Sequence, residues 1–109
     1  MYKFEAVLLF SPDLSSTIVD KEEESFVSLI DKNQGKIISQ ENWGLRDLSF
    51  NINNFKKSFY KYYQIEISGD KIDFLKKNLT QNEKILRHLF VKVTKHQELP
   101  TKMSPNEEK

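Results

Sequence analysis

The chain has 109 residues, a mass of 12.9 kDa and a formal net charge of +1. This length suits one domain, and no apolar run approaches the ~18 residues of a membrane-spanning helix, so we expect no membrane partner. Cysteine is absent, which excludes disulfide scaffolds, thiol catalysis and cysteine-ligated zinc and favours a cytosolic (cytoplasmic) protein.

Charge is unevenly distributed along the chain. Residues 1–52 carry 5 basic and 9 acidic side chains, a net charge of −4, and residues 53–109 carry 12 and 7, a net charge of +5. Chance explains this split as well as function does. The functional interpretation is a molecule with an acidic and a basic side, suited to an anionic and a basic partner.

The first half of the chain predicts a strand, a helix and a second strand. Residues 2–10 end in a fully apolar run, which is typical of a central strand. Apolar positions spaced for a helix follow over residues 17–33, with Ser15, Ser16 or Thr17 as N-cap and Gly35 as the stop. A strand over 36–52 contains Trp43-Gly44, where the glycine indicates a bulge or a close backbone approach.

The second half repeats this order after a turn at 51–54. Residues 55–67 form an aromatic-rich strand, a helix starts at Ser68 and continues to Leu79, and a strand occupies 85–93. Residues 97–109 are polar and predict a C-terminal tail without fixed structure. The order β-α-β-β-α-β predicts an α+β, ferredoxin-like domain over 1–96, with four antiparallel strands and both helices on one face of the sheet.

Catalytic and metal sites find little support. His88 and His96 lie eight residues apart, roughly 27 Å along a strand, so they cannot share a metal ion unless the chain turns back. Acylphosphatase-like enzymes of this fold class need a glycine- and arginine-containing anion cradle, and the first loop, residues 11–15, has neither residue. We expect no enzymatic activity, no metal, no cofactor and no small-molecule substrate.

Nucleic-acid binding has more support. Lys56, Lys57 and Lys61 alternate with aromatic residues. In such a segment the lysines can pair with phosphates and the aromatic rings can stack on bases. Strand alternation predicts Phe59 and Tyr63 in the core, and it places Tyr60 and Tyr62 on the other side, open for stacking or protein contact. The glycine-containing signature of the RNA recognition motif is absent.

Three further cations are candidates for RNA contacts. Arg46 and Arg87 are the only arginines, and a guanidinium suits a specific phosphate contact better than an ammonium does. Lys92 belongs to a basic line on the last strand, although charges on an edge strand also prevent sheet-to-sheet aggregation.

The central stretch Glu41-Asn42-Trp43-Gly44-Leu45-Arg46-Asp47-Leu48-Ser49-Phe50-Asn51-Ile52-Asn53 resembles bacterial small-subunit ribosomal protein six. The resemblance extends in register over residues 1–96 and includes Tyr2-Lys3-Phe4-Glu5 and Tyr63-Gln64-Ile65-Glu66. The chain differs from the family pattern at Asp47, where the family often has a basic or amide residue, and at Asn51, where the family often has proline.

This resemblance implies a structural protein of the small ribosomal subunit. Its expected partners are small-subunit rRNA in the central domain (platform) and small-subunit ribosomal protein eighteen, with cooperative RNA binding and a monomer outside the ribosome. The expected RNA contacts are Lys3, Arg46, Lys56, Lys57, Arg87 and Lys92, and the expected partner contacts are Trp43, Gly44, Tyr60 and Tyr62. The alternative is a free-standing module that stacks single-stranded RNA on Tyr60 and Tyr62.

Overall fold

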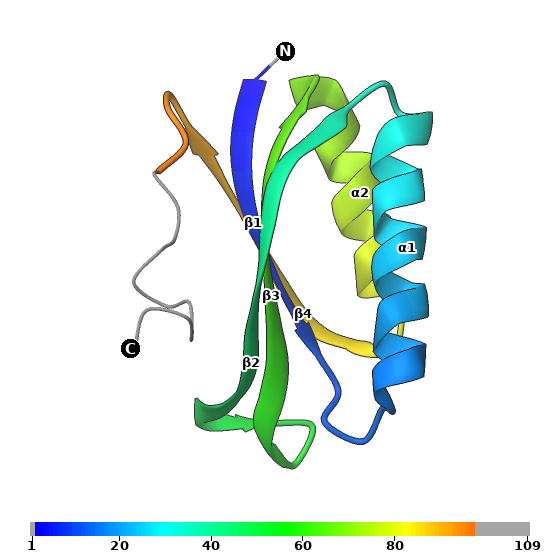
Figure 1. Ribbon diagram of the computed structural model, residues 1–109, viewed down its shortest axis with the longest axis vertical. Helices are drawn as coiled ribbons and strands as arrows, with labels where there is room; N and C mark the ends of the chain where they lie inside the picture. Colours follow the sequence, from blue (N-terminus) through cyan, green and yellow to red (C-terminus); the bar gives the residue numbers. More distant parts are fainter. Residues whose placement is uncertain (1, 98–109) are drawn as a thin grey trace.

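The computed structural model describes residues 2–97 and has the predicted order of elements. The elements are β1 (Tyr2–Phe10), α1 (Ser16–Lys32), β2 (Lys36–Ile52), β3 (Phe55–Ile67), α2 (Gly69–Thr80) and β4 (Ile85–Val93) (Figure 1). The predicted bounds are confirmed to within one or two residues. Neither helix in the described residues is long and apolar enough to cross a membrane.

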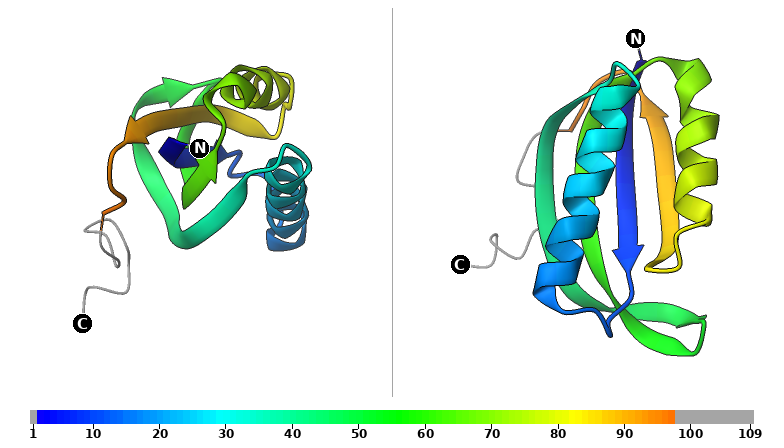
Figure 2. Two further views of the ribbon diagram at one scale, coloured as in Figure 1. Left: turned by 90° about the horizontal axis from the view of Figure 1, so that it is seen from above. Right: turned by 90° about the vertical axis from the view of Figure 1, so that its right-hand side faces the viewer.

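The strands form an antiparallel sheet in the order β2-β3-β1-β4, so the predicted central position of the first strand is confirmed. Both helices cover one face of the sheet, so neither helix of residues 2–97 lies over the opposite face (Figures 1 and 2). The hairpin end of β2 and β3 extends beyond the helix layer (Figure 2). We call the helix-free face the open face.

The core lies between the sheet and the two helices. Alternate residues of β1 point into it, and Ala6, Leu8 and Phe10 have no exposed surface. On β3, Tyr63 pairs with Ala6 and is equally buried, as the alternation predicted, and Ile65, which pairs with Phe4, is buried as well. The helices complete the cluster with Val19, Phe26 and Ile30 of α1 and with Ile72, Leu75 and Leu79 of α2.

The N-terminus of α1 shows which of the three candidate caps is used. Ser15 is the N-cap, and its Oγ accepts a hydrogen bond from the Ile18 backbone N–H at 3.3 Å. The other two candidates, Ser16 and Thr17, already lie inside the helix. At the other end, the Gly35 N–H donates to the Ile30 carbonyl at 2.9 Å, which closes the last turn as predicted.

Candidate nucleic-acid and protein interface

Strand register determines which side chains share the open face. Because Phe4, Ala6 and Leu8 point into the core, the odd-numbered residues of β1 point the other way, together with their partners across the ladder. The open face thus carries, from β1 and β3, Lys3 with Glu66, Glu5 with Gln64, Val7 with Tyr62 and Leu9 with Tyr60. From β4 it carries Arg87, Leu89, Val91 and Val93.

Four of the six predicted RNA contacts belong to this face. Lys3 lies on β1, with its Nζ 3.7 Å from Glu66 Oε2, and Arg87 is exposed on β4. Arg46 of β2 pairs with Ser58, which lies on the open-face side of β3, and strand alternation places Lys56 on the same side. The structure therefore brings cations from all four strands to one face of the sheet.

The other two predicted contacts lie on the helix side. Lys57 pairs with Asp47 across the hairpin, with Nζ 3.5 Å from Oδ1. Lys92 pairs with the core residue Phe4, and its Nζ lies 3.6 Å from the centre of the Tyr2 ring. These two lysines do not share a face with Arg46 and Arg87, so a flat RNA surface cannot contact all six cations at once.

Trp43 and Gly44 form a bulge in β2, as the sequence indicated. The ladder slips between Asn42 and Gly44, and Gly44 has a φ of +80° that suits glycine. The Trp43 indole donates from Nε1 to Glu41 Oε1 at 2.8 Å, and the Trp43 carbonyl accepts from Arg46 Nε at 2.9 Å. The bulge thereby holds the Arg46 guanidinium at the Trp43 backbone carbonyl.

The two candidate stacking tyrosines differ in exposure. Trp43 stacks on Tyr62 with ring centres 5.0 Å apart and planes 12° apart, and Tyr62 is only 2% exposed. Tyr60 is half-buried. Lys61, which the sequence grouped with the nucleic-acid lysines, is buried on the helix side, with its Nζ 3.8 Å from Glu23. Trp43 therefore occupies the place that a base would need on Tyr62.

A polar network beside Tyr62 was not visible in the sequence. Gln64 Nε2 donates to the Tyr62 hydroxyl at 3.0 Å and to the Gln97 carbonyl at 2.8 Å, and Gln97 donates from its backbone to Glu5 at 2.9 Å. Burial raises the pKa of Tyr62, and the neighbouring amides oppose that rise. Gln97 falls in the predicted tail, so the attached chain reaches one residue further than expected; residues 98–109 lie outside the described residues.

An apolar strip occupies the β4 side of the open face. Leu89 is 57% exposed and Val91 is 48% exposed, next to Val7 and Leu9 of β1. Neighbouring exposed apolar side chains on a sheet face are typical of a protein-contact surface. Arg87 borders this strip, so one surface offers both an apolar contact and a cation.

The two histidines have different polar neighbours within the described part of the chain. His88 Nε2 lies 3.1 Å from Thr80 Oγ1 on the helix side, and His96 Nδ1 lies 3.7 Å from Glu5. Burial, with a smaller contribution from Lys76, lowers the pKa of His88. No group of three or more His, Cys, Asp or Glu side chains that could hold a metal ion occurs within residues 2–97.

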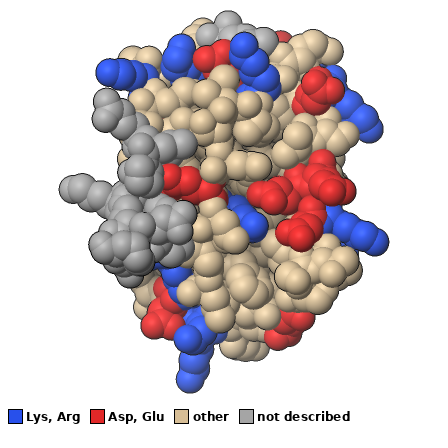
Figure 3. All heavy atoms as spheres, in the orientation of Figure 1, with Lys and Arg blue, Asp and Glu red and all other residues tan. Residues whose placement is uncertain are grey.

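The acidic residues gather elsewhere. Acidic side chains cluster over the side of the molecule where α1 lies (Figure 3), and this helix carries Asp20, Glu22, Glu23, Glu24 and Asp31. The helix side of the sheet thus carries a carboxylate-rich α1, whereas the cations of the open face lie beside Glu5 and Glu66.

Comparisons with known proteins agree with the fold. The family model described as ribosomal protein S6 matches residues 3–92. The small ribosomal subunit protein bS6 of Zymomonas mobilis is 33% identical over 100 residues, covering 92% of this chain and 81% of that protein. The bS6 protein of Orientia tsutsugamushi is 34% identical over 93 residues, covering 85% and 79%. The crystal structure of 30S ribosomal protein S6 from Thermotoga maritima has a TM-score of 0.80 at 18% identity, covering 84% of this chain and 87% of that one.

Proposed function

Because the chain belongs to the ribosomal protein S6 family of the small ribosomal subunit, we propose that it is a non-catalytic component that binds central-domain rRNA together with small-subunit ribosomal protein eighteen. Its place of action is then the ribosome in the cytoplasm, and outside the ribosome it is a monomer. The proposal concerns the open face, where both partners meet.

One observation carries this proposal: exposed Arg87 adjoins the exposed apolar side chains Leu89 and Val91 on a sheet face without helices. An apolar strip favours a protein partner, and a bordering arginine favours phosphate. Together with Lys3, Arg46 and Lys56, Arg87 supplies few cations, so the chain alone neutralises few phosphates and binds RNA weakly. A basic partner on the same surface raises the affinity of both for RNA.

The test is a titration of a central-domain rRNA fragment at fixed salt, with and without ribosomal protein eighteen. We expect weak binding by the chain alone and tight binding with the partner. We expect Arg87→Gln to weaken RNA binding. The matched control is Lys77→Gln, which removes the charge of an exposed lysine on α2 and should leave RNA binding unchanged. Equal affinity with and without the partner would contradict the cooperative mechanism.

The protein contact has its own matched pair of variants. Leu89→Ser removes an apolar side chain from the strip, and Phe74→Ser removes one that is 51% exposed on α2. We expect Leu89→Ser to weaken the complex with ribosomal protein eighteen and Phe74→Ser to leave it unchanged. The stacking alternative predicts tight binding of single-stranded RNA without a partner, and the burial of Tyr62 beneath Trp43 argues against it.

A further inference from the structure

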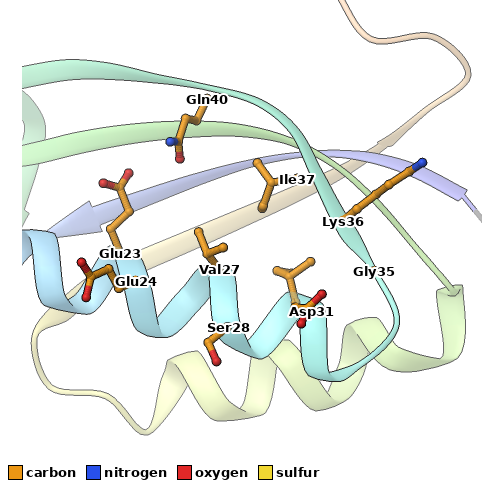
Figure 4. A pocket seen from close by; sticks show the side chains of 10 residues that line it. Glu23, Glu24, Val27, Ser28, Asp31, Gly35, Lys36, Ile37 and Gln40 are labelled. Carbon is orange, nitrogen blue, oxygen red and sulfur yellow. The ribbon is translucent and has the colours of Figure 1, made fainter.

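A groove between α1 and the outer strand β2 is not used by the proposed function. Its volume is about 570 Å³, and it lies on the helix side of the sheet, away from the open face. From α1 it is lined by Glu23, Glu24, Val27 and Asp31, and from β2 by Ile37 and Gln40 (Figure 4). Val27 and Ile37 face each other across the space, so the groove has an apolar floor.

The backbone beside this groove is a sheet edge. β2 is the first strand in the sheet order and pairs only with β3 among the described strands. Its outer edge therefore presents backbone N–H and C=O groups along residues 36–40, next to the groove. An extended peptide can add to such an edge as a further strand and place alternate side chains in the adjacent groove.

The exposed carboxylates that line the groove favour a positively charged occupant. Glu24 and Asp31 are exposed on either side of Val27, about one helical turn away, whereas the Glu23 carboxylate is engaged by Lys61 and Tyr63. Lys36 extends away from the groove (Figure 4). The free carboxylates repel phosphate, which excludes RNA. They also oppose β2-to-β2 pairing with a second copy, which would bring two acidic helices together.

From this geometry we infer that the α1–β2 groove binds an extended basic peptide by β-strand addition. Alternate residues of a strand lie ~6.8 Å apart, close to the ~5.4 Å pitch of the helix that lines the groove. A segment with the pattern basic-any-apolar-any-basic would thus place its apolar side chain on Val27 and Ile37. Its two cations would lie beside Glu24 and Asp31.

The probe is the fluorescein-labelled peptide acetyl-Lys-Thr-Val-Thr-Arg-amide, and its control is acetyl-Val-Lys-Thr-Arg-Thr-amide. The control has the same composition but cannot place both cations and the valine on one face of a strand. We expect the full chain to bind the first peptide more tightly, with amide chemical shifts changing at residues 36–40. Equal affinity for both peptides, or shift changes only on β4 or the open face, would overturn the inference.

Charge reversal tests the acidic lining. The double variant Glu24→Lys with Asp31→Lys turns two ion pairs into repulsions, so we expect binding to weaken about tenfold or more. Asp73→Lys on α2 makes the same kind of charge change outside the groove and should alter binding by less than about twofold. Circular dichroism checks that each variant is folded.

The double variant changes the net charge by +4 and Asp73→Lys changes it by +2. A loss of binding free energy in Asp73→Lys of half that in the double variant, or more, would overturn the inference, since net charge alone would then explain binding. Competition by an rRNA fragment would do so as well. These outcomes are separate from those of the proposed function, because Arg87 and Leu89 lie on the opposite side of the sheet.

Discussion

The Trp43 indole covers the Tyr62 ring at 5.0 Å and is itself only 9% exposed. Trp43→Ala removes this stack and uncovers the hydrogen-bonded hydroxyl network around Tyr62. Truncating a well-buried tryptophan costs roughly 3–5 kcal/mol, and we expect the lower end here because Trp43 lies on a sheet face rather than in the central core. Urea denaturation measures the loss.

The control for Trp43 is Phe50→Ala. Phe50 lies on the same strand but is 68% exposed, so its truncation should change the free energy of unfolding by less than about 0.5 kcal/mol. Similar losses in the two variants would contradict the structural role given to Trp43.

His88 makes the stability of the fold depend on pH. Burial lowers its pKa in the folded state below the ordinary 6.5, and Lys76 adds to this effect. Near that pH the unfolded chain binds more protons at this site, so the contribution of His88 to folding is complete above about pH 6.5 and declines as the pH falls below it.

The measurement is the free energy of unfolding of the unmodified chain and of His88→Gln, at a series of pH values from neutral to mildly acidic. As the pH falls, we expect the free energy of unfolding to decrease more in the unmodified chain than in His88→Gln. A pH-independent difference would show that His88 does not titrate differently on folding.

The β2–β3 hairpin contains two positions where backbone conformation limits the residue type. Asn53 and Asn54 have φ values of +52° and +70°, which suit a two-residue turn that favours Asn-Gly. Asn54→Gly should therefore raise the free energy of unfolding by about 0.5 kcal/mol, because glycine adopts positive φ without steric cost. Chemical denaturation measures the gain, and Asn51→Gly within β2 is a control that should destabilise.

The substitution Gly44→Ala tests how much the positive φ in the β2 bulge contributes to stability. A Cβ there would meet nothing within 4 Å, so any cost of Gly44→Ala comes from the φ of +80° alone. We expect a loss of about 1–2 kcal/mol and a weaker RNA interaction, because Arg46 is held by the carbonyl of the neighbouring Trp43. An unchanged free energy of unfolding would mean that β2 adapts by moving the bulge.

Local periodicity predicted the elements of this fold well. Alternation in 2–10 and 55–67 and helical spacing in 17–33 depend only on neighbours in sequence, and the structure follows them closely. The order of elements then left few topologies, so the α+β, ferredoxin-like prediction is confirmed.

The burial of individual side chains depends on contacts between distant residues, which the local sequence pattern did not contain. Lys61 is buried because Glu23, on another element, pairs with it. Tyr62 is covered because the Trp43 bulge places the indole over it, and the glycine signalled the bulge but not its direction. Gln97 is attached through Glu5, 92 residues earlier in the chain.

The distribution of charge over the two sides predicts how RNA binding responds to salt. Lys3, Arg46, Lys56 and Arg87 share the open face, so the chain alone can contact at most about four phosphates there. The slope of log affinity against log salt should then be no steeper than about −4, by the value of about −0.9 per neutralised phosphate for a duplex. The side chains of α1 are not part of this count, because the helix lies on the other side of the sheet.

Ribosomal protein eighteen would contribute its own cations in the ternary complex, so the proposed function predicts a steeper slope with the partner than without it. Arg87→Gln should make the slope shallower by about one unit in both cases, whereas Lys77→Gln, on α2, should leave it unchanged. Fluorescence anisotropy over a series of potassium concentrations provides the measurement. A slope much steeper than about −4 for the chain alone would mean that cations outside the open face contact RNA, and the assignment of the interface would be wrong.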